Sequence, residues 1–229
     1  MKRYSAFAVA KEALGYHQGW ERAWGAPEMK SEYDVIIIGA GGHGRVLADI
    51  AQAMGYGDIA FLDAQFPDFA HSGAWDIIGT PADLGDDSEY ALGVGDNQSR
   101  MSLLESFPND LATLIHPSAT ISPHAQIGAG SVICAGAIVG PFAKLGQGCI
   151  INTGASVDHD CTLARGVHLS PGARLGGGVS IGARTWVGIG AAVREYKTIG
   201  ADAMIAAGAA VVTDIKDGAR FGGVPAKEF

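Results

Sequence analysis

An imidazole with a carboxylate on each side occurs at Asp158, His159 and Asp160, inside the stretch NTGASVDHDC. Histidine is the side chain whose unperturbed pKa lies nearest neutral pH, so it can accept a proton from a reacting group. A carboxylate that holds the other ring nitrogen fixes the tautomer and stabilises the imidazolium that forms. The triplet indicates a general base, although a histidine on a solvated surface would satisfy the local pattern equally well.

A second group of residues is suited to binding an anion. The apolar run at residues 35–38 has the character of a buried parallel strand, and Gly39-x-Gly41-x-x-Gly44 follows it at the start of an amphipathic helix. Backbone amides at such a helix start suit a phosphate. A further strand ends at Asp63, about twenty residues later, where a carboxylate could meet a ribose or a base. A third apolar run ends near Gly95.

The length of this region limits what it can bind. Only about seventy residues separate Val35 from the repeat tract described below, and a full dinucleotide-binding domain needs roughly twice that length. We therefore expect one mononucleotide-sized site rather than an NAD or FAD site. His43, inside the Gly loop, either contacts the substrate or caps its own turn, and the sequence leaves both roles open.

A six-residue repeat dominates the second half of the chain. From Ile115 to Val211 every sixth residue is Ile, Leu or Val, seventeen positions without a gap, and the residue four places later is nearly always small. This period fits a β-solenoid in which three hexapeptides form one coil and glycines turn the corners. Because neighbours on a strand point to opposite faces, Asp160 reaches His159 only if the pair lies at a coil corner.

Composition excludes several classes of partner. The chain has 229 residues and a net charge of −8, which argues against nucleic acid and against anionic membrane surfaces. No apolar run is long enough to span a bilayer, and Lys11 and Glu12 interrupt the region where a signal peptide would be apolar. Cys134, Cys149 and Cys161 form no CxxC pair, so we interpret them as buried filler and expect a cytoplasmic protein.

From Asp34 to Lys227, about 85% of the chain, the sequence resembles the hexapeptide-repeat acyltransferases typified by sialic-acid O-acetyltransferase and by N-acetyltransferases of nucleotide-linked 4-amino sugars. The matching segments are GAGGHGRVLADIA, FLDA, GVGDNQSR, LIHPSATIS, NTGASVDHDC, VHLSPGARLGGGVSIG, VGIGAAV and GGVPAK. The resemblance implies a small Rossmann-like α/β domain followed by a left-handed parallel β-helix. It also implies a homotrimer, with acetyl-CoA in the clefts between solenoids.

The resemblance also implies roles for individual residues. His159 would be the general base and Asp160, which stands where some relatives have Glu, would raise its basicity. Acetyl-CoA, with no metal, would lie near three residues, His168, Ile189 and Ala207, the last of which is Gly in some relatives. The sugar nucleotide would lie near Gly41, Gly42, His43, Asp63 and Gly95.

Three segments follow from this comparison. Residues 34–110 would form the nucleotide-sugar-binding domain, and residues 111–229 the acetyltransferase domain with its C-terminal tail. Residues 1–33 would be an appendage. Residues 1–44 also resemble the opening of the sarcosine oxidase β subunit, where such an arm precedes a flavin-binding Gly loop, but no flavin domain follows here.

The expected function is N-acetylation of a nucleotide-linked amino sugar, such as a 4-amino-4,6-dideoxy sugar. Acetyl transfer from a thioester to an amine needs the neutral amine, and His159 could accept the proton as the amine attacks. O-acetylation of sialic acid or another sugar is the alternative within this class, and a non-catalytic nucleotide-sugar-binding scaffold is a further one. A metalloenzyme of the β-helical carbonic-anhydrase type is disfavoured, because His124 and His159 fall on different positions of the repeat.

Overall fold

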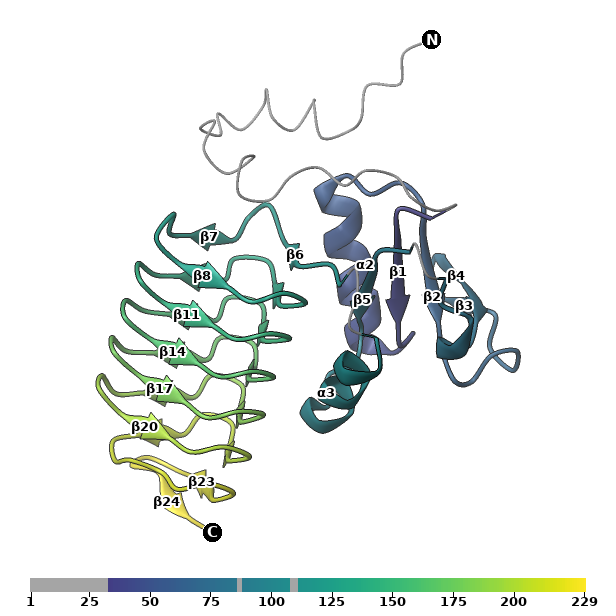
Figure 1. The fold of residues 1–229 in the computed structure, drawn as a ribbon. Coiled ribbons are helices and arrows are strands. Elements are labelled where there is room, and N and C mark those ends of the chain that lie inside the picture. The colour runs from purple at the N-terminus through teal and green to yellow at the C-terminus, as the bar shows by residue number, and fades with distance from the viewer. Residues whose placement is uncertain (1–32, 86–87, 108–110) are drawn as a thin grey trace.

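The structure is a computed structural model that describes residues 33–85, 88–107 and 111–229. The appendage predicted over residues 1–33 therefore lies, except for its last residue, outside the described residues. The described chain forms an α/β unit and then a solenoid of short strands (Figure 1). No helix in the described ranges has both the length and the apolar character that crossing a bilayer requires.

The α/β unit is built on a five-stranded sheet in the order β3-β4-β2-β1-β5. In this sheet β1 (Val35–Ile38) pairs in parallel with β2 (Ile59–Leu62) and β5 (Tyr90–Leu92), and every residue of these three strands is buried. Continuous apolar runs of this kind are typical of strands covered on both faces. The other elements are α2 (Gly42–Met54), β3 (His71–Ser72), β4 (Trp75–Gly79), the 3-10 helix η2 (Pro81–Asp83) and α3 (Asn97–Ser106).

The Gly loop lies where the strand order of this sheet reverses. The chain leaves β1 through the loop, forms α2 and returns as β2 on one side of β1, whereas β5 lies on the other side. Ligands of open α/β sheets bind outside the carboxyl ends of the strands at such a reversal. The fold thus positions the Gly loop and the residues that follow β5 at one edge of the sheet.

The solenoid is a triangular coil whose three walls are parallel sheets. Strands two residues long stack on the equivalent strands 18 residues away, for example Ile150 on His168 and Ile151 on Leu169. In nearly every strand the second residue is buried, because it carries the aliphatic side chain of the six-residue repeat. These side chains and the small residues of the repeat fill the interior. The predicted hexapeptide-repeat solenoid behind a small α/β unit is confirmed.

We name the walls faces I, II and III in the order in which each coil visits them. Face I contains β7 (Thr120–Ile121), β10 (Ile138–Val139), β13 (Ser156–Val157), β16 (Arg174–Leu175), β19 (Ala192–Val193) and β22 (Ala210–Val211). Face II contains β8 (Gln126–Ile127), β11 (Lys144–Leu145), β14 (Thr162–Leu163), β17 (Ser180–Ile181) and β20 (Thr198–Ile199). Face III contains β6 (Leu114–Ile115), β9 (Val132–Ile133), β12 (Ile150–Ile151), β15 (His168–Leu169), β18 (Trp186–Val187), β21 (Met204–Ile205), β23 (Arg220–Gly222) and β24 (Lys227–Glu228).

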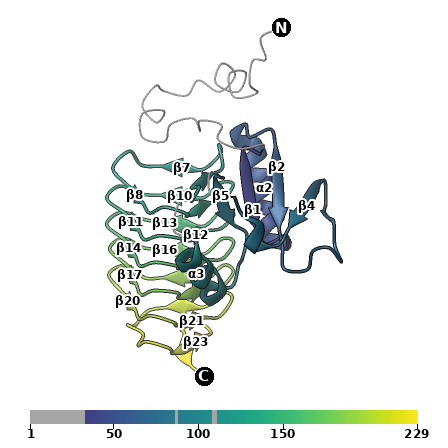
Figure 2. The same cartoon turned by 45° about the vertical axis from the view of Figure 1, so that its right-hand side comes forward.

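The α/β unit packs on face III and its two edges. Helix α2 contacts β6, and α3 lies against the II/III corner, as Figures 1 and 2 show from two directions. The guanidinium of Arg100, on α3, is completely buried there and donates to the carbonyl oxygens of Gly148 and Gly166, both at 2.9 Å. Met101 packs on the same two glycines. These contacts hold the Gly loop at a defined height along the solenoid.

Candidate active site

His159 and Asp160 lie at the I/II corner, between β13 and β14. Asp160 has a left-handed backbone conformation, with a φ of 58°, and this turn brings its carboxylate back to the preceding residue. The Nδ1 atom of His159 is 2.8 Å from Oδ2 of Asp160. The corner that this pairing required is therefore present, and the shorter Asp side chain reaches the ring. Asp158 instead accepts a hydrogen bond from the backbone amide of His159, at 2.7 Å.

The pairing sets the protonation chemistry of His159. The Asp160 hydrogen bond raises the pKa of the imidazole above its ordinary value, and the Asp158 charge adds to this shift. In the neutral ring, Asp160 favours the tautomer with the proton on Nδ1, so the Nε2 lone pair is available to accept another proton. The His159 side chain is 47% exposed, which makes it accessible to a substrate.

Gly177 makes room for this ring. A Cβ atom at Gly177 would clash with Nε2 and Cε1 of His159. Gly177 was not among the site residues predicted from the sequence. The run of three glycines at 176–178, where most corner turns carry one or two, is the signal that could have identified it.

The Gly loop has the open surface that its sequence predicts. Gly41 and Gly42 are exposed, and a Cβ at either would meet no atom within 4 Å. Gly44 differs, because a Cβ there would collide with the backbone oxygen of Gly39, so it serves the packing of α2 on β1. Asp63 holds the loop from outside, since Oδ2 accepts from the amide of Ala40 at 2.7 Å.

His43, Gly95 and His168 converge between the α/β unit and face III. The ring centroids of His43 and His168 are 6.3 Å apart, and Trp186 lies 4.7 Å beyond His168. His168 is 5% exposed, and its Nε2 lies 3.2 Å from the side-chain nitrogen Nδ2 of Asn152. Gly95 accepts a hydrogen bond from Arg100 at 3.0 Å.

Both of these imidazoles are neutral at neutral pH. Burial, followed by the charge of Arg100, lowers the pKa of His43 to about 4. The same two causes, together with His43 itself, lower the pKa of His168 to about 3. Nε2 of His43 and Nδ1 of His168 have no hydrogen-bond partner among the described residues. The two rings therefore form an uncharged contact between the two units.

Arg100 and Asn97 were not identified from the sequence, although both lie in the matched segment GVGDNQSR. Asn97 donates to the carbonyl oxygen of Arg184 at 2.8 Å, and its own side-chain oxygen accepts from Arg100 at 2.8 Å. Together they fasten the start of α3 to the II/III corner. The sequence gives little indication of these contacts, because a charged residue such as Arg100 is almost never fully buried and is therefore expected at the surface.

The remaining predicted residues, Ile189 and Ala207, lie at the III/I corner in successive coils. The side chain of Ile189 is exposed, and its carbonyl oxygen accepts from the amide of Gly208 at 2.8 Å. Along the same corner, in coils nearer the N-terminus, a groove of about 400 Å³ separates the solenoid from α2. It is lined by Gly42, Arg45, Val46, Asp49, Ile50, His116, Cys134, Ala135 and Thr153.

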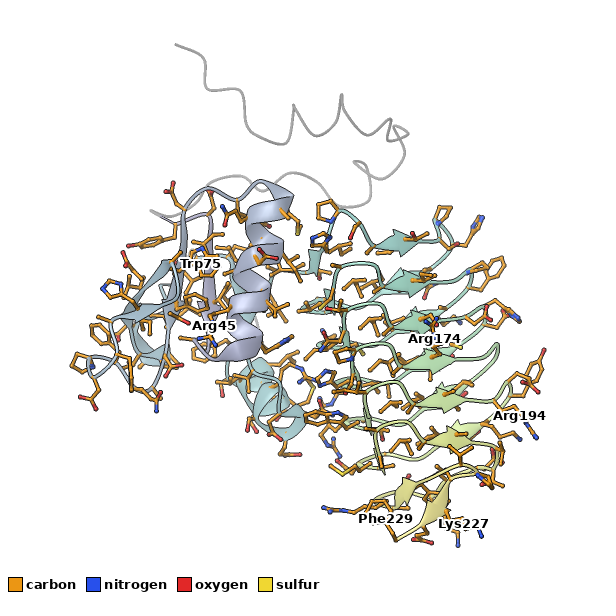
Figure 3. All side chains as sticks on the ribbon, turned by 180° about the vertical axis from the view of Figure 1, so that it is seen from behind. Arg45, Trp75, Arg174, Arg194, Lys227 and Phe229 are labelled. Atoms are coloured by element: carbon orange, nitrogen blue, oxygen red, sulfur yellow. The ribbon has the colours of Figure 1, made fainter. Side chains whose placement is uncertain are left out.

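Within one chain the predicted sugar-nucleotide residues and the predicted base lie in separate places. The Gly loop, His43 and His168 gather at face III, whereas His159 and Asp160 lie at the I/II corner, which is the vertex of the triangle opposite that face. Figure 3 shows Arg194, from the same corner, at the edge of the solenoid farthest from the α/β unit and from Arg45. A substrate held by the Gly loop cannot reach His159 of the same chain through the packed interior.

The cysteines and possible metal ligands add no further site. Cys149 and Cys161 are fully buried and donate to the carbonyl oxygens of Ala164 and Gly176, and burial raises the pKa of the Cys149 thiol to about 11. Within the described residues, no three His, Cys, Asp or Glu side chains gather closely enough to hold a metal ion.

Comparison with known proteins identifies relatives of both units. The family model described as the PglD N-terminal domain matches residues 34–107. UDP-N-acetylbacillosamine N-acetyltransferase of Bacillus subtilis is 40% identical over 112 residues, 44% of this chain, and the chain spans 51% of that relative's length. Sarcosine oxidase subunit beta of Rhodobacter capsulatus is 67% identical over 48 residues, 21% of this chain, but only 12% of that protein is covered.

Solved structures match nearly all of the described chain. The acetyltransferase domain of PglB from Neisseria gonorrhoeae, in complex with acetyl coenzyme A, is 40% identical, with 87% of this chain and 100% of that chain covered and a TM-score of 0.83. A histidine-to-asparagine variant of perosamine N-acetyltransferase from Caulobacter crescentus, in complex with CoA and GDP-perosamine, is 35% identical, with coverages of 88% and 99% and a TM-score of 0.82. The chain belongs to the hexapeptide-repeat acetyltransferase family that includes these two proteins.

Proposed function

We propose that this protein transfers the acetyl group of acetyl-CoA to an amine on a nucleotide-linked amino sugar, such as a 4-amino-4,6-dideoxy sugar. The observation that carries the proposal is the His159–Asp160 pair, an oriented and accessible base in a chain of this family. Two relatives support the substrate class, since one is named as a UDP-N-acetylbacillosamine N-acetyltransferase and another was solved in complex with CoA and GDP-perosamine.

In the proposed reaction the substrate amine attacks the thioester carbonyl carbon. A carbon–nitrogen bond forms, the carbon–sulfur bond breaks, and CoA leaves as the thiol or thiolate. Nε2 of His159 accepts the proton that the amine loses, and Asp160 stabilises the resulting imidazolium. Transfer is direct, because Cys149 and Cys161 are buried inside the solenoid with their thiols bonded to carbonyl oxygens.

Structures of a relative show that ligand binding can survive the replacement of a histidine. Perosamine N-acetyltransferase was solved with both CoA and GDP-perosamine in two variants, one with asparagine and one with alanine in place of a histidine. Such a variant therefore holds both ligands in that enzyme. In this chain we assign the role of general base to His159, with the donor near His168, Ile189 and Ala207 and the sugar nucleotide near Gly41, Gly42, His43, Asp63 and Gly95.

The separation of these groups within one chain supports a homotrimer. The Gly loop lies on face III and His159 at the opposite corner, so a complete site needs the Gly loop of one subunit and His159 of its neighbour. Flat solenoid walls that pack around a three-fold axis would bring the two together. The domain boundaries 34–110 and 111–229 remain part of this proposal.

The test is an acetyl-transfer assay with a panel of nucleotide-linked amino sugars, in which turnover is measured as the release of the free CoA thiol. We expect turnover with at least one amino sugar and none with the corresponding hydroxy sugar or with free sialic acid. Turnover of sialic acid alone would replace N-acetylation by O-acetylation, and nucleotide binding without thiol release would leave only a scaffold.

Subunit sharing has its own test. His159→Asn and Gly42→Val each remove one half of the proposed site, so co-expression should yield mixed trimers in which some interfaces carry both intact halves. Random mixing places both intact halves at about a quarter of the interfaces, so about a quarter of the wild-type activity should return. No recovery from mixed trimers, confirmed by differently tagged subunits, would contradict a shared site.

A further inference from the structure

The I/II corner carries side chains where another corner carries only glycine. Phe142, Asp160 and Tyr196 all have left-handed φ values, between 56° and 60°, at positions 18 residues apart or a multiple of it, with Gly178 completing the column. At the III/I corner the equivalent left-handed positions are all glycine, namely Gly136, Gly154, Gly172, Gly190 and Gly208. Non-glycine residues are unfavourable in this conformation, so each needs contacts that compensate for the strain. At the II/III corner Arg184 and Asp202 also adopt it, and there Nη2 of Arg184 donates to Oδ2 of Asp202 at 2.6 Å.

Asp160 already has a function in this column, as the partner of His159. Phe142, one coil toward the N-terminus, stacks on His124 with ring centroids 5.4 Å apart. Tyr196 has no such stacking partner among the described residues and is 71% exposed. A large aromatic side chain that is both strained and exposed needs an explanation other than folding.

Tyr196 shares a glycine floor with the proposed base. A Cβ at Gly177 would collide with the His159 ring, and a Cβ at Gly178 would collide with the Tyr196 ring. The backbone links the same corner turns, because Gly178 donates to the carbonyl oxygen of His159 and Tyr196 donates to that of Gly177, each at 2.9 Å. Neighbouring coils are about 4.8 Å apart, so Tyr196 lies roughly 10 Å from His159 along the solenoid.

Coil height indicates which substrate lies on that side. The groove beside Gly42 and Arg45 is lined by His116, Ala135 and Thr153, which lie in the coil of His159 or in coils nearer the N-terminus. The proposed donor residues lie nearer the C-terminus: Ile189 is in the same coil as Tyr196, and Ala207 is in the next coil. In the proposed trimer, a three-fold axis parallel to the solenoids leaves coil height unchanged between subunits. Pairing His159 with the Gly loop of the neighbour then places the I/II corner of one subunit beside the III/I corner of the next, at the same level.

We propose that Tyr196 is a donor-binding residue whose ring packs against the pantetheine arm of acetyl-CoA, between the thioester at His159 and the nucleotide end of the molecule. This inference rests on the proposed function. An aromatic face offers a rigid apolar wall for the methylene and amide groups of that arm. The left-handed backbone projects the ring outward from the corner, over the glycine floor.

The experiment measures the Kd of coenzyme A by calorimetry, together with the melting temperature in its absence. Tyr196→Gly removes the ring and puts the residue that tolerates positive φ best at this corner. We expect CoA to bind about tenfold more weakly while the melting temperature does not fall. Tyr196→Phe should remain within about twofold of the wild-type Kd, because it keeps the ring.

Phe142→Gly is the matched control, since it removes an exposed aromatic ring from the same corner and the same backbone conformation on the other side of His159. Its Kd for CoA should stay within about twofold of wild type. An unchanged Kd in Tyr196→Gly, or an equal loss in Phe142→Gly, would overturn the assignment while leaving the proposed function intact. Failure of the wild-type protein to bind CoA would instead overturn both.

Discussion

Replacing the proposed base gives the most direct test of the chemistry. His159→Asn keeps a polar side chain of similar size at the I/II corner. The ring is partly exposed, and the backbone bond from Gly178 to the His159 carbonyl does not depend on the side chain. The variant should therefore fold, assemble and bind both substrates as the wild type does.

The catalytic effect should be large because the imidazole has the features of a positioned base. Its Nδ1 is held 2.8 Å from Asp160, which leaves Nε2 to accept the amine proton. A positioned general base contributes about 10²–10⁴ to the rate, so kcat should fall by that factor with little change in KM. Raising the pH should restore part of the loss, because more of the substrate amine is then neutral without help.

The assay is kcat from thiol release under conditions where a burst experiment has shown chemistry to be rate-limiting. Calorimetry with CoA confirms that donor binding is intact. If His159→Asn keeps more than about half of the wild-type kcat, His159 is not the base, since this loss is far below the range for such a group. The imidazole would then be only a polar residue at a solvated corner.

Three further predictions follow from the site. Asp160→Asn removes the hydrogen bond that raises the pKa of His159. The acid limb of the profile of kcat against pH should therefore move to lower pH, and the maximum rate should fall. An acid limb that stays in place would exclude this coupling. Gly42→Val should weaken binding of the sugar nucleotide and leave the melting temperature unchanged. The reason is that a Cβ at this position meets no atom of the fold but would crowd a phosphate. If calorimetry finds equal affinity for the sugar nucleotide, the Gly loop is not part of the site. Because the folded pKa values of His43 and His168, about 4 and about 3, lie below the ordinary 6.5, the unfolded chain binds protons first and stability should fall as the pH drops from 6.5 toward 4. His168→Asn should reduce that slope by about 1.4 kcal/mol per pH unit in urea unfolding, and an unchanged slope would mean that His168 is not held neutral.

Much of the fold could be predicted because its determinants are local and repeated. The aliphatic residue at every sixth position from Ile115 to Val211 requires a coil that buries it each time, and this requirement alone predicts the solenoid. The Gly loop is equally local, since Gly44 must pack against the strand it follows while Gly41 and Gly42 stay open. The His159–Asp160 contact joins adjacent residues and needed only a corner to form.

The arrangement of the site could not be predicted in the same way. His43 and His168 were assigned to different substrates, yet they meet in one buried contact across 125 residues of sequence. Arg100 would be expected on the surface, but carbonyl groups of the II/III corner satisfy its guanidinium and make its burial favourable.

The two units, the repeat and the local chemistry of His159 can be predicted from local patterns, since each depends on residues that are neighbours along the chain or one coil apart. Which wall of the solenoid the α/β unit covers becomes known only in the folded chain. That choice depends on contacts such as those of Arg100 and Met101, whose partners lie about fifty or more residues away. Because the unit covers face III, the Gly loop and His159 are on opposite sides of one chain, and no local pattern encodes that separation.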